Sequence, residues 1–128
     1  MLNQTAIYAL RAMGFLAQRQ NSTPVLSATI AKEMDIPKNF LSKILNRLVQ
    51  SGLVQAIRGR NGGFMLARPA PKIRLYEVVN LFMIINDFQK CFLGMKVCDG
   101  GCGMHLRWKI IMEQFEKILN ETTVDQIF

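Results

Sequence analysis

The sequence predicts a mainly α-helical fold with one small β-hairpin and a long helix near its end. Three segments with apolar residues at helical spacing come first, and two short apolar runs around a glycine-rich basic tip follow them. A final amphipathic segment lies beyond a stretch that holds all three cysteines. The length of 128 residues suits one compact domain with an extension, which we expect to divide into residues 1–72 and 73–128.

The first two helices are predicted by short apolar repeats. Apolar residues recur at intervals of three and four over about residues 5–19, and polar residues with a proline at 20–24 end that helix. A short second helix follows, and the hydroxyl of Ser27 can cap its first turn. Pro37 then forces a turn, because it disfavours helical geometry at Ile36 while it suits the first position of a helix.

The third predicted helix, about residues 37–51, has two distinct faces. Its apolar face contains Leu41, Ile44, Leu45, Leu48 and Val49. Its polar face contains Lys38, Asn39, Ser42, Lys43, Asn46 and Arg47. We expect the apolar face to enter the core and Gly52 to end the helix in a left-handed conformation.

A basic β-hairpin should follow the third helix. Residues 53–57 and 64–67 have the composition of two short strands, and Arg-Gly-Arg-Asn-Gly-Gly at 58–63 supplies the glycines that a tight tip requires. The order of helix, turn, helix and basic hairpin is that of a winged helix-turn-helix domain.

The extension is predicted to contain two helices around a glycine-rich loop. Residues 75–85 are apolar almost all round, so that other elements must cover this helix on more than one side. The last helix, about residues 106–120, has an apolar stripe wider than packing onto a small winged domain requires. We therefore expect a homodimer, with Trp108, Ile111, Phe115 and Ile118 at the dimer interface.

Positive charge is concentrated in the middle of the chain. Residues 32–74 carry nine basic and two acidic side chains, an excess of +7 that equals the net charge of the whole chain. This local excess favours a polyanion as partner. The longest apolar run, residues 81–85, is too short to span a membrane, and the first residues lack the basic start of a secretion signal. We therefore expect a cytoplasmic protein with no membrane partner.

Winged domains bind double-stranded DNA by presenting short polar side chains to base edges and by placing the wing along the backbone. The residues expected to contact DNA are Ser27, Lys38, Asn39, Ser42, Lys43, Asn46, Arg47, Arg58, Arg60, Asn61 and Gly62. The same architecture also serves protein–protein contacts and some RNA binding, and charge alone does not distinguish these partners. A protein-interaction adaptor therefore stays an alternative. We do not expect an enzyme, because the chain has one histidine and no paired carboxylates flank a glycine-rich turn.

Four potential soft metal ligands lie in a glycine-rich loop at about residues 88–105. Cys91, Cys98, Cys102 and His105 form the pattern C-x₆-C-x₃-C-x₂-H, enough donors to enclose one metal centre. An odd, clustered set of cysteines argues against a disulfide framework. Thiolate ligands favour an iron–sulfur cluster or zinc, and the spacing does not separate the two. A structural zinc site or a thiol switch is therefore the alternative to a cluster.

The sequence resembles the Rrf-two (Rrf2) family of bacterial transcription regulators over nearly its whole length. The segments that carry the resemblance are Tyr-Ala-Leu-Arg-Ala at 8–12, residues 40–48, Ser-Gly-Leu-Val at 51–54, Arg-Gly-Arg-Asn-Gly-Gly-Phe at 58–64 and Cys-Gly-Met-His-Leu-Arg-Trp at 102–108. The family includes regulators of iron–sulfur assembly and nitric-oxide-responsive repressors. The resemblance implies a homodimer on palindromic promoter DNA, with the third helix in the major groove, the wing beside it and the last helices crossing at the interface.

The resemblance also implies an iron–sulfur cofactor. Cys91, Cys98 and Cys102 would hold a cluster whose state, set by iron supply, nitric oxide or redox conditions, changes DNA affinity, and His105 would complete a 2Fe–2S site. Relatives that hold 4Fe–4S can use an acidic residue of the partner's first helix, and Ile7, at the corresponding place, cannot bind iron. The 2Fe–2S form is therefore favoured over 4Fe–4S. Exposed clusters are lost to oxygen, so that protein handled in air is easily obtained in the apo form.

Overall fold

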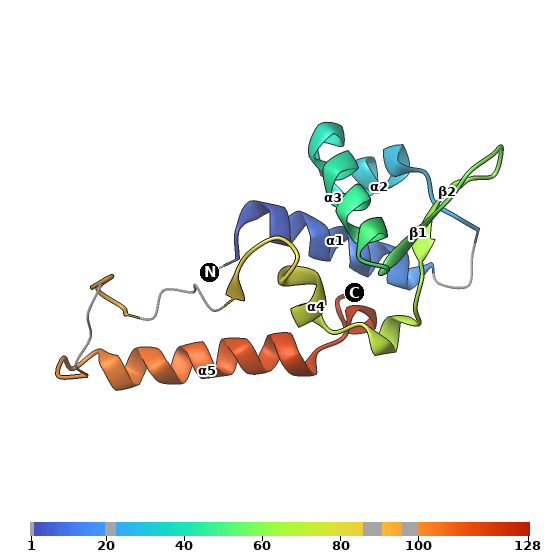
Figure 1. Ribbon diagram of the computed structural model, residues 1–128. Helices are drawn as coiled ribbons and strands as arrows, with labels where there is room; N and C mark the ends of the chain where they lie inside the picture. Colours follow the sequence, from blue (N-terminus) through green and yellow to red (C-terminus); the bar gives the residue numbers. More distant parts are fainter. Residues whose placement is uncertain (1, 20–22, 86–90, 96–99) are drawn as a thin grey trace.

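A computed structural model describes residues 2–19, 23–85, 91–95 and 100–128 of the chain. The elements run in the order α1 (Gln4–Gln18), α2 (Ser27–Met34), α3 (Lys38–Gln50), β1 (Val54–Ile57), β2 (Gly63–Leu66), η1 (Ala70–Lys72), α4 (Leu75–Val79), α5 (His105–Glu121) and η3 (Val124–Gln126). The hairpin projects from one end of the molecule, and α5 lies along one side and extends beyond the other elements (Figure 1). The predicted helical fold with a small wing and a long last helix is confirmed.

Helix α1 lies at the centre of a single hydrophobic core. Ala6, Ala9 and Ala12 are fully buried, and their small side chains let neighbouring helices approach the α1 backbone closely. The same cluster of buried residues includes Leu48 of α3 and Leu119 of α5. The core therefore draws on both the winged part and the extension.

Helix α3 is placed by its apolar face. Leu41, Ile44, Leu45 and Leu48 are buried, as the pattern predicts. Gly52 follows with φ +83°, its N–H donates to the Val49 carbonyl, and the Leu53 N–H donates to the Leu48 carbonyl at 3.1 Å. This pair of hydrogen bonds is a Schellman motif, so the predicted left-handed end of the helix is confirmed.

The hairpin strands pair in antiparallel register, with Val54 opposite Leu66 and Ile57 opposite Gly63. The wing is also tied to the chain before α2, because the backbones of Val25 and Phe64 exchange two hydrogen bonds of 2.8 and 2.9 Å. This bridge keeps the preceding segment extended and sets the position of the wing against the start of α2.

The beginnings of α2 and α3 differ from the sequence prediction. Ser27 is the first residue of α2 and not its cap: the capping position belongs to Leu26, no side chain caps this helix, and the Leu26 carbonyl accepts the first backbone hydrogen bonds. The extended pairing at Val25 leaves the chain in β geometry as far as Leu26, which moves the helix start by one residue. Pro37 likewise occupies the capping position of α3, and the helix begins at Lys38.

The predicted helix over residues 75–85 is too long. Helix α4 ends at Val79, after which the N–H groups of Leu81 and Phe82 donate to carbonyls only three residues back. The carboxamide of Asn3 donates to the Phe82 carbonyl at 3.0 Å and so binds an acceptor that a longer helix would use internally. The hydrogen bond from Asn3, which precedes α1, therefore lies just beyond the point where α4 ends.

The segment after α5 returns to the body of the molecule. The Leu75 N–H donates to the Thr122 carbonyl and the Val124 N–H to the Ile73 carbonyl, each at 2.9 Å. Val124 is fully buried in the core. These bonds fix the C-terminal end of α5 against α4, while its N-terminal half extends away (Figure 1). None of the described helices is both long and apolar enough to span a membrane.

Candidate nucleic-acid interface and cysteine segment

The exposed face of α3 carries only neutral polar, basic and aromatic side chains. Every residue of α3 that was predicted to contact DNA is exposed, namely Lys38, Asn39, Ser42, Lys43, Asn46 and Arg47. No carboxylate occurs anywhere in the helix. Three leucines and one isoleucine anchor the opposite face of α3 in the core. The polar side chains of the exposed face therefore lie on a rigid support.

Ser42 has a defined hydrogen-bonding role on this face. Its hydroxyl donates to the Lys38 carbonyl one turn earlier, at 3.0 Å. The proton is thereby directed into the helix, and the oxygen presents lone pairs outward. Toward a ligand, Ser42 is therefore an acceptor, whereas Lys43 and Arg47 can only donate.

The wing tip presents Arg58, Arg60 and Asn61 to solvent, and all three are exposed. Gly62 is buried in the turn instead: its N–H donates to the Gly59 carbonyl at 3.1 Å, and a β-carbon on Gly62 would collide with the Ile57 carbonyl. The structure thus gives Gly62 a part in shaping the tip that carries the two arginines.

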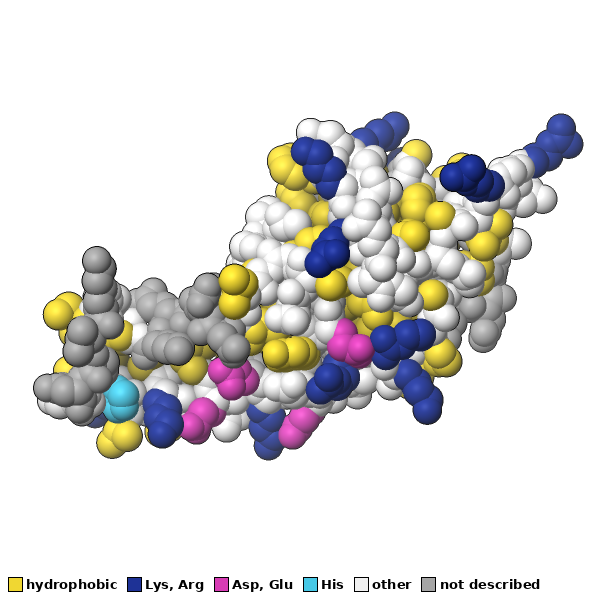
Figure 2. All heavy atoms as spheres, in the orientation of Figure 1, with side chains coloured by type: hydrophobic (Ala, Val, Ile, Leu, Met, Phe, Trp, Pro, Cys, Tyr) yellow, Lys and Arg dark blue, Asp and Glu magenta, His cyan; other side chains and the backbone are white. Residues whose placement is uncertain are grey.

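The basic groups of α3 and the wing gather on one side of the molecule. Figure 2 shows Lys and Arg side chains above α3 and at the far end of the hairpin, while the acidic side chains visible on this face lie lower, over α4 and α5. In the part of the chain that the structure describes, the single salt bridge joins Arg68 and Glu77. The charges of α3 and the wing are therefore available to an external anion.

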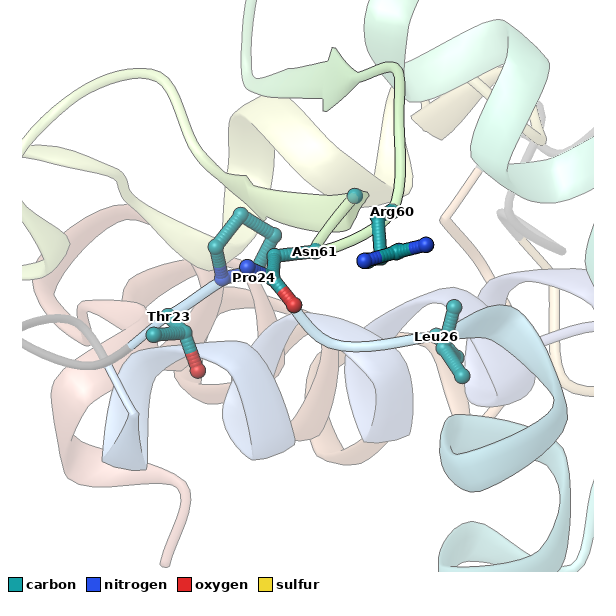
Figure 3. A pocket seen from close by; sticks show the side chains of 6 residues that line it. Thr23, Pro24, Leu26, Arg60 and Asn61 are labelled. Atoms are coloured by element: carbon teal, nitrogen blue, oxygen red, sulfur yellow. The ribbon is translucent and has the colours of Figure 1, made fainter.

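A shallow pocket of about 230 Å³ separates the wing tip from the chain that leads into α2. Thr23, Pro24, Leu26, Arg60, Asn61 and Gly62 line it. Figure 3 shows Arg60 and Asn61 projecting from the wing over the segment around Pro24 and Leu26. Ser27, also predicted to contact DNA, follows directly and is half-buried at the first position of α2.

Sequence reasoning missed three exposed residues on this surface. Phe40 is 51% exposed on α3, and its ring centroid lies 6.3 Å from that of Tyr8. Gln50 is exposed at the end of α3, and Leu26 is 60% exposed beside the wing. The sequence contains a signal for Phe40, since this large apolar residue lies outside the apolar repeat of α3 and directly follows the polar Lys38 and Asn39.

The described part of the cysteine segment brings two of the four predicted ligands to the start of α5. His105 is the first residue of that helix, and Cys102 is exposed just before it. The imidazole lies beside Gly100, where an added β-carbon would be 3.7 Å from the ring Nε2. Cys91 is buried, at 8% exposure, and Cys98 lies outside the described residues.

The described donors do not assemble a complete metal site by themselves. Among the described residues, no three His, Cys, Asp or Glu side chains gather closely enough to hold a metal ion. The full donor set of three thiols and one imidazole, with Cys98 included, still fits an iron–sulfur cluster or zinc by its chemistry.

Helix α5 exposes a large apolar surface. Ile111 and Ile118 are 51% and 55% exposed, although the sequence predicts that both are covered in a dimer. Trp108 and Phe115 are half-buried: the Trp108 ring packs edge-on against Phe92 with centroids 5.5 Å apart, and Phe115 contacts the hydrophobic core. The stripe therefore has an inner edge that packs within the chain and an outer edge that faces solvent.

Known proteins resemble this chain over nearly its whole length. It is 31% identical over 122 residues to the HTH-type transcriptional regulator IscR of Klebsiella pneumoniae, an alignment that covers 94% of this chain and 74% of the relative. The solved structure of IscR from T. potens superposes with a TM-score of 0.75 at 22% identity, covering 97% of this chain and 82% of that one. The structure of CymR (YrzC), the global cysteine regulator of B. subtilis, superposes with a TM-score of 0.79 at 21% identity, covering 99% and 95%.

The family is established by a model of the whole domain. The model for Rrf2, described as an iron-dependent transcriptional regulator, matches residues 2–128. With the winged fold and the IscR relative, this match shows that the chain belongs to the Rrf2 family of DNA-binding transcriptional regulators, which is not a family of enzymes.

Proposed function

We propose that this regulator is a homodimer that binds duplex promoter DNA through α3 and the wing, and that an iron–sulfur cluster in the segment 91–105 sets its DNA affinity. In this proposal residues 1–72 bind DNA, while residues 73–128 join two copies and hold the sensing group. The observation that carries the proposal is the acid-free, exposed face of α3 beside the basic wing tip.

The charge arrangement supports a polyanionic partner. Lys38, Lys43 and Arg47 lie on the exposed face of α3, and Arg58 and Arg60 stand at the wing tip. Each cation that neutralises a phosphate releases counterions, so that binding must weaken as salt increases. Direct contacts from α3 to base edges would add sequence preference to this electrostatic binding.

DNA binding is tested by titrating duplex DNA at several salt concentrations and measuring fluorescence anisotropy. Replacing Arg58 and Arg60 with alanine should weaken binding and lower the slope of log affinity against log salt by about 0.9 for each phosphate that is no longer neutralised. The matched control replaces Lys109 and Lys117 on α5, which are equally basic and exposed. A slope that is the same in both double variants would contradict the assignment of the wing.

The dimer is supported by the outer edge of the α5 stripe. Exposed isoleucines in the middle of a long helix are stabilised when a second copy covers them. Replacing Ile111 and Ile118 with aspartate should convert a dimer into a monomer in sedimentation velocity. The control Lys109→Asp changes charge on the same exposed helix without removing apolar area. A wild-type chain that sediments as a monomer at high concentration would refute this part of the proposal.

The cluster is supported by the donor chemistry and by the family's description as iron-dependent. Cys91, Cys98, Cys102 and His105 would hold it, with 2Fe–2S favoured over 4Fe–4S. Such a group, when bound, supplies a centre whose charge and occupancy respond to iron supply, nitric oxide and oxidants. Any effect on DNA affinity requires that binding at the loop favour one arrangement of the two winged parts over another.

The cluster is tested by purification without oxygen from iron-supplied cells, followed by a visible spectrum and by iron and acid-labile sulfide analysis. Cys98→Ala should lose the absorbance and alter DNA affinity. Met95→Leu is the control, because it changes an exposed sulfur-containing side chain of the same segment that is not a predicted ligand. The proposal would be refuted if the wild-type protein were colourless and free of iron, and if its DNA affinity did not change with redox treatment.

A thiol switch or a zinc site is the second candidate function. The exposure of Cys102 favours reaction with oxidants, and one solved neighbour of this fold is an oxidized form of CymR from Staphylococcus aureus. Stoichiometric zinc without sulfide would establish the zinc site. The switch would be established if a thiol oxidant changed the DNA affinity of the metal-free wild-type protein but left that of the Cys102→Ser variant unchanged.

A further inference from the structure

Two carboxamides mark the centre of the exposed face of α3. Asn39 and Asn46 are seven residues apart, so they differ by only about 20° around the helix axis. Both are exposed, and among the described residues neither side-chain carboxamide makes a hydrogen bond. Ser42 and Lys43 lie between them on the same face, and Ile44 and Leu45 point into the core.

The chemistry of this row restricts which bases it can recognise. A carboxamide pairs with adenine through two hydrogen bonds, one to N7 and one from the N6 amine, whereas Lys and Arg pair with guanine N7 and O6. Glu and Asp, which accept from the cytosine amine, are absent from α3. The exposed face is therefore suited to purines on the strand that it contacts.

We infer that Asn39 and Asn46 each read an adenine in the operator half-site and that Lys43 reads a guanine between them. This inference rests on the proposed binding of duplex DNA by α3. The helix rises 1.5 Å per residue, which places the two carboxamides about 10 Å apart along the axis. At about 3.4 Å for each base pair, the two adenines lie about three base pairs apart.

The position of Arg47 separates its role from that of Lys43. Arg47 lies about 100° around the helix from Asn46, on the edge of the exposed face that Phe40 shares. Side chains at the edges of a recognition helix meet the walls of the groove, where the phosphates lie. Arg47 therefore contributes affinity for any duplex, and Lys43 contributes preference for one base.

The experiment selects binding sites from a pool of random duplexes with the full-length protein and compares four proteins: wild type, Asn39→Ala, Asn46→Ala and the control Gln18→Ala. Gln18 is an exposed carboxamide at the end of α1. Each asparagine variant should lose preference at one adenine and keep the remaining motif, and its affinity for the wild-type site should fall about 5- to 150-fold. Gln18→Ala should select the wild-type motif.

Modified DNA identifies the atoms involved. Replacing one selected adenine with 7-deazaadenine removes N7 and leaves base pairing intact. This change should weaken wild-type binding but have little further effect on the asparagine variant assigned to that position, which is the signature of a direct contact in a double-mutant cycle. Circular dichroism checks that the variants fold, and alanine is the better helix former at both positions.

The outcomes separate this inference from the proposed function. Wild-type protein that selects no sequence at all would refute the proposed function. A selected motif that both asparagine variants retain unchanged, or that loses preference at a position other than adenine, would refute the carboxamide readout and leave DNA binding by α3 intact.

Discussion

Gly14 of α1 lies directly under the side chain of Phe128, so that a β-carbon on Gly14 would be 2.8 Å from the Phe128 ring and 2.8 Å from Cγ2 of Ile127. The absence of a side chain at Gly14 lets the segment after α5 cross the central helix. This contact joins the last residues of the structure to the helix at the centre of the core.

Gly14→Ala should lower the free energy of unfolding by about 1 kcal/mol, because a clash of about 1–3 kcal/mol exceeds the helix-propensity gain of about 1 kcal/mol. The sign should reverse in a background that carries Ile127→Ala and Phe128→Ala. There the clash is gone, and the same change should stabilise by up to about 1 kcal/mol. Urea unfolding of the four proteins measures both values. An equal effect in both backgrounds would mean that the segment does not pack on Gly14 in solution.

Asn3 performs two tasks that substitutions can separate. Its Oδ1 accepts a hydrogen bond from the Ala6 N–H at 2.8 Å and caps α1, while its Nδ2 donates to the Phe82 carbonyl. Asn3→Ala should cost about 1–2 kcal/mol in unfolding free energy, and Asn3→Ser should cost less because serine keeps the cap. Both variants should speed amide hydrogen exchange around residues 82–85. Unchanged exchange there would show that the Asn3–Phe82 bond contributes nothing to the end of α4.

The ion pair of Arg68 and Glu77 should make stability depend on pH. Burial raises the pKa of Glu77, but the hydrogen bond from Arg68, the backbone N–H of Arg74 and the charges of both arginines outweigh it, so that the pKa lies below its ordinary value. A carboxylate whose pKa is lower in the folded state stabilises the fold above its unfolded pKa, and this contribution disappears as pH falls through the folded pKa.

Glu77→Gln should therefore be less stable than wild type near pH 7 by less than about 1 kcal/mol, since Arg68 is 40% exposed. The difference should shrink below about pH 4.5 as the wild-type carboxylate takes up its proton. Thermal unfolding of both proteins at a series of pH values checks the trend. A difference that grows toward low pH would have the wrong sign for this pair.

Local patterns predicted the elements that local geometry determines. The apolar repeat of α3 and the left-handed end at Gly52 were predicted correctly, because both depend on residues within one or two turns of each other. The wing was predicted from its glycines for the same reason. By contrast, the chain just beyond the end of α4 is bound by Asn3, which donates to the Phe82 carbonyl from 79 residues away. No short sequence pattern predicts a contact between residues so far apart.

The candidate site likewise has features that local sequence predicts and features that depend on contacts between distant residues. The donor-rich face of α3 follows from residue types and helical spacing alone. Ser27 was wrongly predicted to cap α2 because the bridge between Val25 and Phe64, which the sequence does not reveal, holds the chain extended up to Leu26. The exposure of Phe40 also depends on tertiary packing, in this case against Tyr8 of α1.

The bridge between Val25 and Phe64 leads to a prediction about the wing. Gly63 has φ +146°, and a β-carbon there would lie 2.5 Å from the Val25 carbonyl oxygen, which is backbone and cannot move aside. Gly63→Ala should therefore separate the wing from the chain before α2 and weaken DNA binding, while the buried faces of α1 and α3 retain their packing. Gln18→Ala is the control, because it changes an exposed side chain at the end of α1, outside α3, the wing and the cysteine segment.

Two measurements test the role of Gly63 together. Amide exchange at Val25 and Phe64 should accelerate in Gly63→Ala, and affinity for duplex DNA should fall by about the amount that Arg58→Ala with Arg60→Ala causes, since both changes remove the wing from the backbone. Combining Gly63→Ala with the two arginine changes should then add little. If the effects were additive, the arginines would bind DNA without the bridge, and the position of the wing against α2 would have no part in DNA binding.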